Sequence, residues 1–167
     1  MNLTAINALS PDELKGQFST CCGSSKWSQL MVHAAPFPSE EALFEAADKS
    51  WAACVEEDWQ EAFRHHPRIG DLDSLRKKFA DTRHLAINEQ AAVNHASEET
   101  LLALKSGNDE YELRFGFIFI VFASGKSAGE MLGLLQQRLF NDRTTELHTA
   151  AAEQHKITLL RLKKLLQ

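Results

Sequence analysis

Cysteine is scarce in this chain of 167 residues, which has only Cys21, Cys22 and Cys54. The number is odd, and the spacing matches neither a metal-ligand pattern nor a redox motif. Reduced thiols in the cytoplasm are therefore the simplest interpretation. A chain of this length buries roughly 70% of its extended surface on folding, which is enough for a core without disulfides or a structural metal.

Basic residues are fewer than acidic ones. Lysine and arginine together number 18 against 23 aspartates and glutamates, so the formal net charge is −5. A protein that binds nucleic acid needs a basic surface to offset phosphate repulsion. We therefore expect no nucleic-acid partner.

Long hydrophobic runs are absent. The longest dense apolar stretch, Phe115 to Ala123, is about half the length that a membrane-spanning helix needs. The first residues lack a basic region followed by an apolar segment, which is the pattern of a secretory signal. The last residues, Leu165-Leu166-Gln167, do not form a peroxisomal address. These features predict a cytoplasmic protein with no membrane association.

Helix-breaking residues are few, with four prolines and eight glycines, and no low-complexity tract, linker or internal repeat is evident. Apolar residues recur with the 3.6-residue period of an α-helix through most of the chain. At this length one domain is the default expectation. The sequence therefore predicts an all-α, single-domain, multi-helix bundle over residues 1–167.

Helix boundaries are marked by local signals. Ser10 to Glu13 forms a capping box with proline at the first helical position, and Ser39 and Ser127 are further candidate N-caps. Gly107 is the expected end of a helix that begins near Ser97, and Asn108 the expected cap of the next. We predict helices after Ser10 and Ser39, from about Val55 to His66, around Ala86–His95, over 97–107, from Asn108 towards Phe115, after Ser127, and from about Asp142 to Leu166.

The stretch Phe117 to Phe122 departs from the helical period. Its aromatic and β-branched residues suit a strand, but the sequence contains no partner strand. We interpret it as the buried end of a helix that passes into an extended segment at the core.

The pentapeptide His66-Pro67-Arg68-Ile69-Gly70 stands where a helical pattern stops. Proline disfavours the α region for the residue before it, so His66 should end the helix. A histidine at that place is a proton donor or acceptor near neutral pH on a fixed backbone. The pentapeptide by itself is more typical of a plain helix stop followed by a turn.

Glu89 and Gln90 are predicted to lie in the first turns of a helix, with Asn88 as a candidate cap. The positive end of the helix dipole stabilises an ionised carboxylate there. Glu89 could act as a general base or orient a polar substrate. Taken alone, the pair is more typical of a helix-capping acid beside a solvated amide, with no part in chemistry.

Two other functions are not supported. The segment Ala123 to Ser127 resembles the end of a phosphate-binding loop, but the glycine needed five residues before Gly125 is replaced by Ile120. The seven histidines show neither an HExxH motif nor paired Cys/His spacing. We therefore expect neither a nucleotide nor a metal cofactor.

The C-terminal segment from Lys156 to Lys164 predicts a basic amphipathic helix, whose leucines suit packing onto the domain. Arg161 stands among apolar neighbours. Its guanidinium either extends outward to water or binds a buried anion.

Taken together and in order, these segments resemble the 2-oxo-4-hydroxy-4-carboxy-5-ureidoimidazoline (OHCU) decarboxylase family, which acts in urate breakdown. The resemblance covers essentially the whole chain. It rests on His66 to Gly70, Glu89-Gln90, Tyr111 to Val121, Ala123 to Ser127, and Asn141 to Leu147.

The resemblance implies an all-α homodimer that acts as a cofactor-independent carboxy-lyase and produces (S)-allantoin. It implies His66, Glu89 and Arg161 as the catalytic residues. Members of the family also bind substrate through positions that correspond here to Pro67, Ala86, Ile87, Asn88, Glu89, Gln90, Phe119, Ile120, Val121, Phe122 and Ala123.

One departure concerns Ala86, because family members commonly have serine three residues before the glutamate. A lost hydrogen bond to substrate typically costs about 0.5–1.5 kcal/mol, which weakens binding without removing the chemistry. Two alternatives therefore stay open at the level of sequence. One is a helical interaction module without catalysis, and the other is a related enzyme acting on another ureido or imidazoline substrate.

Overall fold

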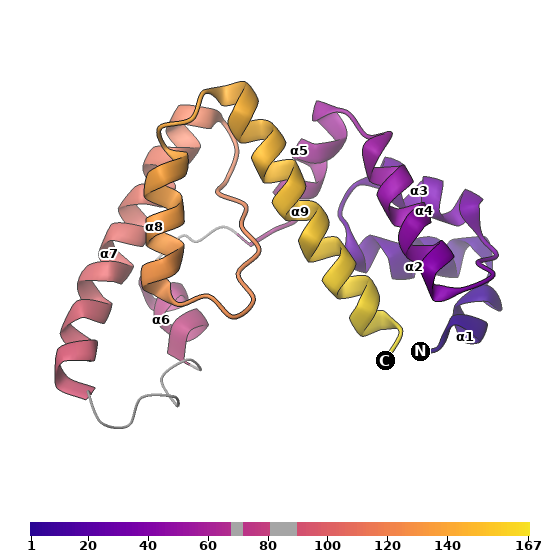
Figure 1. Ribbon diagram of the computed structural model, residues 1–167, viewed down its shortest axis with the longest axis horizontal. Helices are drawn as coiled ribbons and strands as arrows, with labels where there is room; N and C mark the ends of the chain where they lie inside the picture. Colours follow the sequence, from indigo (N-terminus) through magenta and orange to yellow (C-terminus); the bar gives the residue numbers. More distant parts are fainter. Residues whose placement is uncertain (68–71, 81–89) are drawn as a thin grey trace. The chain divides into compact units, whose positions relative to one another are not determined.

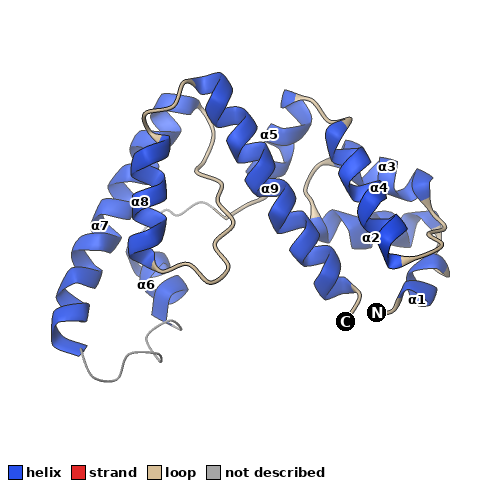
Figure 2. Ribbon diagram, viewed as in Figure 1, coloured by secondary structure: helices blue, strands red, loops and turns tan. Residues whose placement is uncertain are grey.

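The computed structural model describes residues 1–67, 72–80 and 90–167 of the chain, and side chains at 78, 80 and 90–97 are outside that description. Within these residues the chain is helical, with no strand, as Figure 2 shows. The all-α prediction is confirmed. In order, the helices are α1 (Leu3–Asn7), α2 (Pro11–Cys21), α3 (Ser25–Ala34), α4 (Glu40–Ala52), α5 (Glu56–Arg64), α6 (Leu72–Ala80), α7 (Gln90–Phe115), α8 (Ala128–Arg138) and α9 (Arg143–Leu165).

The helix starts follow the local signals in the sequence. Ser10 accepts a hydrogen bond from the backbone N–H of Glu13 and the Glu13 carboxylate accepts one from the Ser10 N–H, which completes the capping box of α2. Ser39 and Ser127 are the N-caps of α4 and α8, and each side chain accepts a hydrogen bond from the backbone N–H three residues later. These three predictions are confirmed.

The chain divides into two compact units. The first comprises Met1–His66 and Thr149–Gln167, and the second comprises Pro67–His148, so the boundary falls inside α9. The organisation of the whole chain as a single domain stays a prediction.

The first unit contains α1 to α5 and most of α9 (Figure 1). Its core includes Phe18, whose ring meets those of Trp27 and Phe37 edge to face. The buried indole of Trp27 donates to the Ala47 carbonyl, and that of Trp51 donates to the Ala151 carbonyl at 3.0 Å. The second of these bonds attaches α9 to α4.

The second unit is built on the packing of α7 against α8, which lie side by side in Figure 1. A long connection from Gly116 to Ser127 joins them and contains no helix. Phe117, Phe119 and Val121 in this connection are buried, and the rings of Phe117 and Phe119 meet the ring of Tyr111. The expected extended segment at the core is therefore present, although the helix ends before the apolar stretch, at Phe115.

The predicted break at Gly107 is wrong, because a single helix, α7, continues through this position. A Cβ atom at Gly107 would lie 2.6 Å from Cδ2 of the fully buried Leu135 on α8. Glycine is thus needed here for close helix packing and not for a helix end. Asn108 caps no helix, since its side-chain amide donates to the Leu104 carbonyl one turn earlier.

Alanine substitutions at two glycines inside helices should show whether Gly107 is needed for helix packing. At Gly133 of α8 no atom lies within 4 Å of a new Cβ, so Gly133→Ala should raise the free energy of unfolding by about 0.5–1 kcal/mol. Gly107→Ala should lower it by about 1–3 kcal/mol, because the methyl group overlaps Leu135. Urea denaturation measures both changes. Equal stabilisation by the two substitutions would contradict the packing role of Gly107.

Candidate active site

The turn after α5 carries the first predicted catalytic side chain. His65 is the C-cap of α5, the backbone N–H of His66 donates to the Phe63 carbonyl at 3.1 Å, and Pro67 follows in an exposed position. The helix therefore ends at the His-Pro step, as the sequence predicts. The His66 side chain is half-buried.

The imidazole of His66 is held by a residue far away in the chain. Its Nε2 lies 2.5 Å from Oε1 of Gln154, which is fully buried on α9. The side-chain amide nitrogen of Gln154 donates to Oγ1 of Thr158, also fully buried, at 3.3 Å. A buried amide such as that of Gln154 requires hydrogen-bond partners, and His66 is one of them. The contact therefore fixes the imidazole of His66 against α9.

Arg161 lies on the same helix. Gln154, Thr158 and Arg161 are four and then three residues apart, a spacing that places side chains on one face of an α-helix. The guanidinium of Arg161 donates to the Cys21 carbonyl at 3.3 Å. In the first unit, α9 thus carries one predicted catalytic residue, Arg161, and holds another, His66, through Gln154 two turns earlier.

The nearby thiols are not suited to nucleophilic chemistry. Burial raises the pKa of the Cys22 thiol to about 11, and it also raises the pKa of Cys21 and of Cys54. The thiolate is the reactive form of cysteine, so these groups stay protonated near neutral pH. They serve as small apolar core side chains.

The segment from Phe119 to Ala123 lies in the second unit and is held through its backbone. Arg138 donates from Nη1 to the Ile120 carbonyl at 2.6 Å. Lys126 donates from Nζ to the Phe122 carbonyl at 2.8 Å and from its backbone N–H to the Ala123 carbonyl at 3.1 Å. The segment thus has a defined backbone although it forms no regular structure.

A buried polar network supports this segment. Arg138 donates from Nε to Oε1 of the fully buried Glu146 at 2.6 Å, and Tyr111 donates its phenolic hydrogen to the same oxygen. The second oxygen of Glu146 accepts from the Asn141 amide at 3.0 Å. Because every member has partners, the ion pair avoids the penalty of an unpaired buried charge.

The environment of Tyr111 changes its acidity. Burial raises the pKa of Tyr111 well above its ordinary value, and the hydrogen bond to Glu146 is the second-largest cause of this increase. The phenol therefore remains protonated and continues to donate to the carboxylate. Arg138 also lies over the ring of Phe119, 4.6 Å from its centroid, which adds a cation–π contact to the same segment.

Several predicted residues are not tested by this geometry. Ala86, Ile87, Asn88 and Glu89 lie outside the described residues, and Gln90 begins α7 with a side chain that is not described. His66 and Arg161 belong to the first unit, while Pro67 and the 119–123 segment belong to the second. The convergence of these groups on one pocket stays a prediction.

The other sequence interpretations can be compared with the described residues. Gly125 has φ +74°, Lys126 is bonded to the preceding loop and Ser127 caps α8, as expected of a loop that leads into a helix. Over residues 1–67, 72–80 and 90–167, no three His, Cys, Asp or Glu side chains gather as a metal site would require. Among the helices that the structure describes, none has the length and apolar character needed to cross a membrane.

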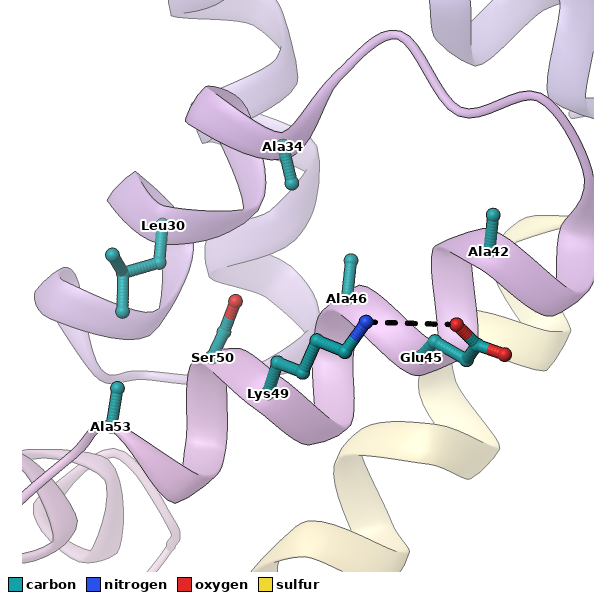
Figure 3. Close-up of a pocket in the computed structure, with 8 residues that line it drawn as sticks. All are labelled: Leu30, Ala34, Ala42, Glu45, Ala46, Lys49, Ser50 and Ala53. Atoms are coloured by element: carbon teal, nitrogen blue, oxygen red, sulfur yellow. Dashed lines mark ion pairs between the residues drawn. The ribbon is translucent and has the colours of Figure 1, made fainter.

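A groove of about 370 Å³ lies between α3 and α4 (Figure 3). Its charged groups are Lys49 and Glu45, which form an ion pair at 3.7 Å. The lining otherwise consists of alanines, Leu30 and Ser50, and it contains none of the predicted site residues. With its cation already paired, this groove has no strong feature for binding an anion.

Sequence reasoning missed Gln154, Thr158 and the roles of Arg138 and Glu146. Arg138 stands three residues after Leu135, on the buried face of α8, and a charged residue at a position of the apolar pattern was the available signal. Gln154 and Thr158 had no such signal, because polar residues one turn apart are equally typical of a solvent-exposed helix face.

Comparison with known proteins gives consistent results. The family model described as OHCU decarboxylase matches residues 7–163. The chain is 38% identical over 149 residues to the uric acid degradation bifunctional protein TTL of Arabidopsis thaliana, covering 89% of this chain but only 46% of that protein. It is 25% identical to the 2-oxo-4-hydroxy-4-carboxy-5-ureidoimidazoline decarboxylase of Haloferax volcanii, over 97% of this chain and 94% of that one.

Among solved structures, the chain is similar to a crystal structure of OHCU decarboxylase in the presence of (S)-allantoin. The TM-score is 0.70 and the identity is 37%, over 90% of this chain and 96% of the other. The fold and much of the sequence are therefore shared with that protein.

Tyr111 is the sole tyrosine, so its ionisation reports on the buried network alone. Its pKa is raised in the folded state, so the stability that it contributes is complete below its unfolded pKa of about 10 and is lost as pH rises through the folded value. Glu146→Gln should lower the pKa of Tyr111, and burial should keep it above the ordinary value. Tyrosinate absorbance measured against pH tests this.

The matched control is Glu130→Gln, which makes the same chemical change on the exposed first turn of α8. It should leave the tyrosine titration unchanged. A titration of the folded protein at the ordinary pKa of tyrosine would contradict the network.

Proposed function

This chain belongs to the OHCU decarboxylase family, and we propose that it converts 2-oxo-4-hydroxy-4-carboxy-5-ureidoimidazoline to (S)-allantoin without a cofactor. The main support is the 37% identity, over 90% of the chain, with an OHCU decarboxylase whose crystal structure was determined in the presence of (S)-allantoin. The family match at residues 7–163 also includes every residue to which we assign a role.

The reaction needs no external electron acceptor. One ring carbon of the substrate carries both the carboxylate and a hydroxyl, next to a C=N bond. When the bond to the carboxylate breaks, its electron pair moves towards that C=N, and carbon dioxide leaves. The hydroxyl becomes a carbonyl and gives up its proton. The ring nitrogen and the ureido-bearing carbon each gain a proton, so the net uptake is one proton.

We assign the proton transfers to His66. Its half-buried ring is fixed by Gln154 on one side, and a positioned imidazole is effective in general acid–base catalysis. The proton must reach one face of the ureido-bearing carbon to give the S product. A ring held in one orientation meets that requirement.

We assign charge and orientation to the remaining residues. Arg161 would stabilise the negative charge that develops as the carboxylate departs. Glu89 would accept hydrogen bonds from the ureido or ring N–H groups, with Gln90 and the 86–88 segment beside it. Pro67 and the 119–123 segment would contact substrate, and apolar groups such as Phe119 and Ile120 would exclude water and strengthen these interactions.

We propose further that the protein acts in the cytoplasm, in line with its three free cysteines, and that it forms a homodimer. Leu113 and Phe140 support the dimer, since they are 89% and 88% exposed in the second unit. Their neighbours in sequence are joined by a hydrogen bond from Arg114 to the Asn141 carbonyl. Covering large apolar side chains of this kind favours association.

Substitution of His66 tests the catalytic assignment. The unstable substrate can be generated in situ from urate with the two preceding enzymes, and the circular dichroism of allantoin then follows the enantiomeric product. His66→Ala and Glu89→Ala should each slow the enzymatic reaction about 10²–10⁴-fold and remove the enantiomeric enrichment. The far-ultraviolet spectrum should stay helical.

His33→Ala is the matched control, because His33 is exposed in the last turn of α3 and has no assigned role. It should retain the full rate. Full rate in both the His66 and the Glu89 variants would show that the roles are wrongly assigned.

The dimer is tested by the double variant Leu113→Ser, Phe140→Ser. Loss of both exposed apolar side chains should shift the mass measured by light scattering from dimer to monomer, because the apolar area available for burial is removed. Val55→Ser is the control, since Val55 is also exposed but lies in the first unit. A monomeric wild-type protein would exclude this proposal.

A further inference from the structure

The long connection between α7 and α8 carries a single charged side chain. From Phe115 to Gly129 the sequence contains no acidic residue, and Lys126 is its one basic residue. Lys126 is half-buried, whereas Ser124 and Gly125 beside it are exposed. Withdrawing a charge from water is costly, so a cation at this place needs interactions that compensate for the lost hydration.

The chain turns sharply just before this lysine. Gly125 has φ +74°, a left-handed conformation that favours glycine, and the backbone N–H of Lys126 donates to the Ala123 carbonyl at 3.1 Å. The ammonium group lies back over the preceding residues. Its Nζ donates to the Phe122 carbonyl at 2.8 Å and is 5.5 Å from the centroid of the Phe122 ring. The cation therefore contacts the 119–123 segment, to which we assign substrate binding.

The charge of Lys126 is not neutralised by a carboxylate in the part of the chain that the structure describes. Arg76, Lys105 and Arg138 of the same unit differ, because each of them forms an ion pair. An ammonium group has three hydrogens, and the Phe122 carbonyl accepts one of them. Two hydrogens and the positive charge remain available to a ligand.

The substrate and the product of the proposed reaction differ in charge. The substrate has a carboxyl group, and such groups have ordinary pKa values of about 4 or below, so it is an anion near neutral pH. (S)-Allantoin has lost that group and is uncharged. An ammonium group can therefore form a charge-assisted hydrogen bond with the carboxylate of the substrate and has no such partner in the product.

We propose that Lys126 binds the carboxylate of the substrate and so favours the anionic substrate over the uncharged product. The identity of the anion rests on the proposed function. The cation itself is a property of the chain without substrate. The proposal also gives a role to Gly125, Lys126 and Ser127, a motif in which Ile120 excludes the phosphate-binding loop that it resembles.

This contact should support binding more than chemistry. The electron pair of the breaking bond moves away from the carboxylate, and carbon dioxide leaves without charge, so the attraction to Lys126 weakens as the reaction proceeds. An interaction that is no stronger in the transition state than in the bound substrate lowers KM without raising kcat. Lys126 therefore differs from Arg161, to which we assign stabilisation of the charge that develops.

Steady-state kinetics with substitutions at Lys126 measure this difference. Lys126→Gln removes the charge and keeps an N–H donor, and Lys126→Met removes both. Each should raise KM about 10-fold, as expected when a hydrogen bond to a charged group is lost, with kcat changed less than about twofold. Lys126→Arg keeps the charge and should keep a KM close to that of the wild type. A wild-type KM in Lys126→Gln would overturn the proposal, because the donor and not the charge would then be what matters.

Lys105→Gln is the matched control. It makes the same chemical change in the same unit, but Lys105 lies on α7 and is paired with Asp109 at 3.1 Å. Its KM should equal that of the wild type, and far-ultraviolet spectra should show that all variants stay helical. An equal rise of KM in Lys105→Gln would trace the effect to net charge and would contradict a site at Lys126.

Calorimetry separates this proposal from the proposed function, because it needs no turnover. The probes are diureidoacetate, a stable molecule with a carboxylate and two ureido groups, and (S)-allantoin, which is uncharged. Diureidoacetate should bind to Lys126→Gln about 10-fold more weakly than to the wild type, whereas (S)-allantoin should bind equally to both proteins.

Three calorimetric results would exclude the anion site. They are equal affinity of diureidoacetate for both proteins, an equal loss of affinity for both probes, and no binding of diureidoacetate to the wild type. A wild type that shows the expected affinities but releases no carbon dioxide from the substrate would refute the proposed function and leave the anion site in place.

Discussion

The first unit depends on the burial of polar side chains on α9. Gln154 and Thr158 are fully buried there, and the Trp51 indole donates to the Ala151 carbonyl of the same helix. A buried amide that loses a hydrogen-bond partner costs about 1–3 kcal/mol, so the contact with His66 contributes to the stability of the first unit. The same contact that satisfies the helix therefore orients the side chain proposed for catalysis. The hydrogen bond between His66 and Gln154 thus serves both the stability of the unit and the proposed function.

The second unit uses a different interaction for a similar purpose. The ion pair of Arg138 and Glu146 is buried, and replacing such pairs with apolar groups is often neutral or stabilising in proteins. Stability alone therefore does not explain it. The remaining donor of Arg138 extends to the Ile120 carbonyl, in a segment with no helical or strand bonds of its own. The charge pair thus helps to fix the backbone conformation of this segment.

The parts of this structure that the sequence predicted are those determined locally. Ser10, Ser39 and Ser127 cap helices because their side chains bond to backbone a few residues away. The break at Gly107 was predicted wrongly because the reason for that glycine is the distant Leu135. Gln154 was missed for the same reason, since its partner is 88 residues away. The resemblance to a family made His66 and Arg161 candidate catalytic residues, but it could not supply the contacts that hold them.

The backbone of the 119–123 segment has a consequence for the charge of a substrate bound there, as we propose. The carbonyl oxygens of Ile120, Phe122 and Ala123 already accept hydrogen bonds, two of them from cationic side chains. A molecule that approaches this strip meets a main chain whose electron-rich oxygens are engaged and partly neutralised. Such a strip repels a carboxylate much less than free carbonyls would, and it offers little to an ammonium group. Discrimination between acids and amines can thus be built from main-chain atoms, and it would persist when the side chains of the segment are replaced.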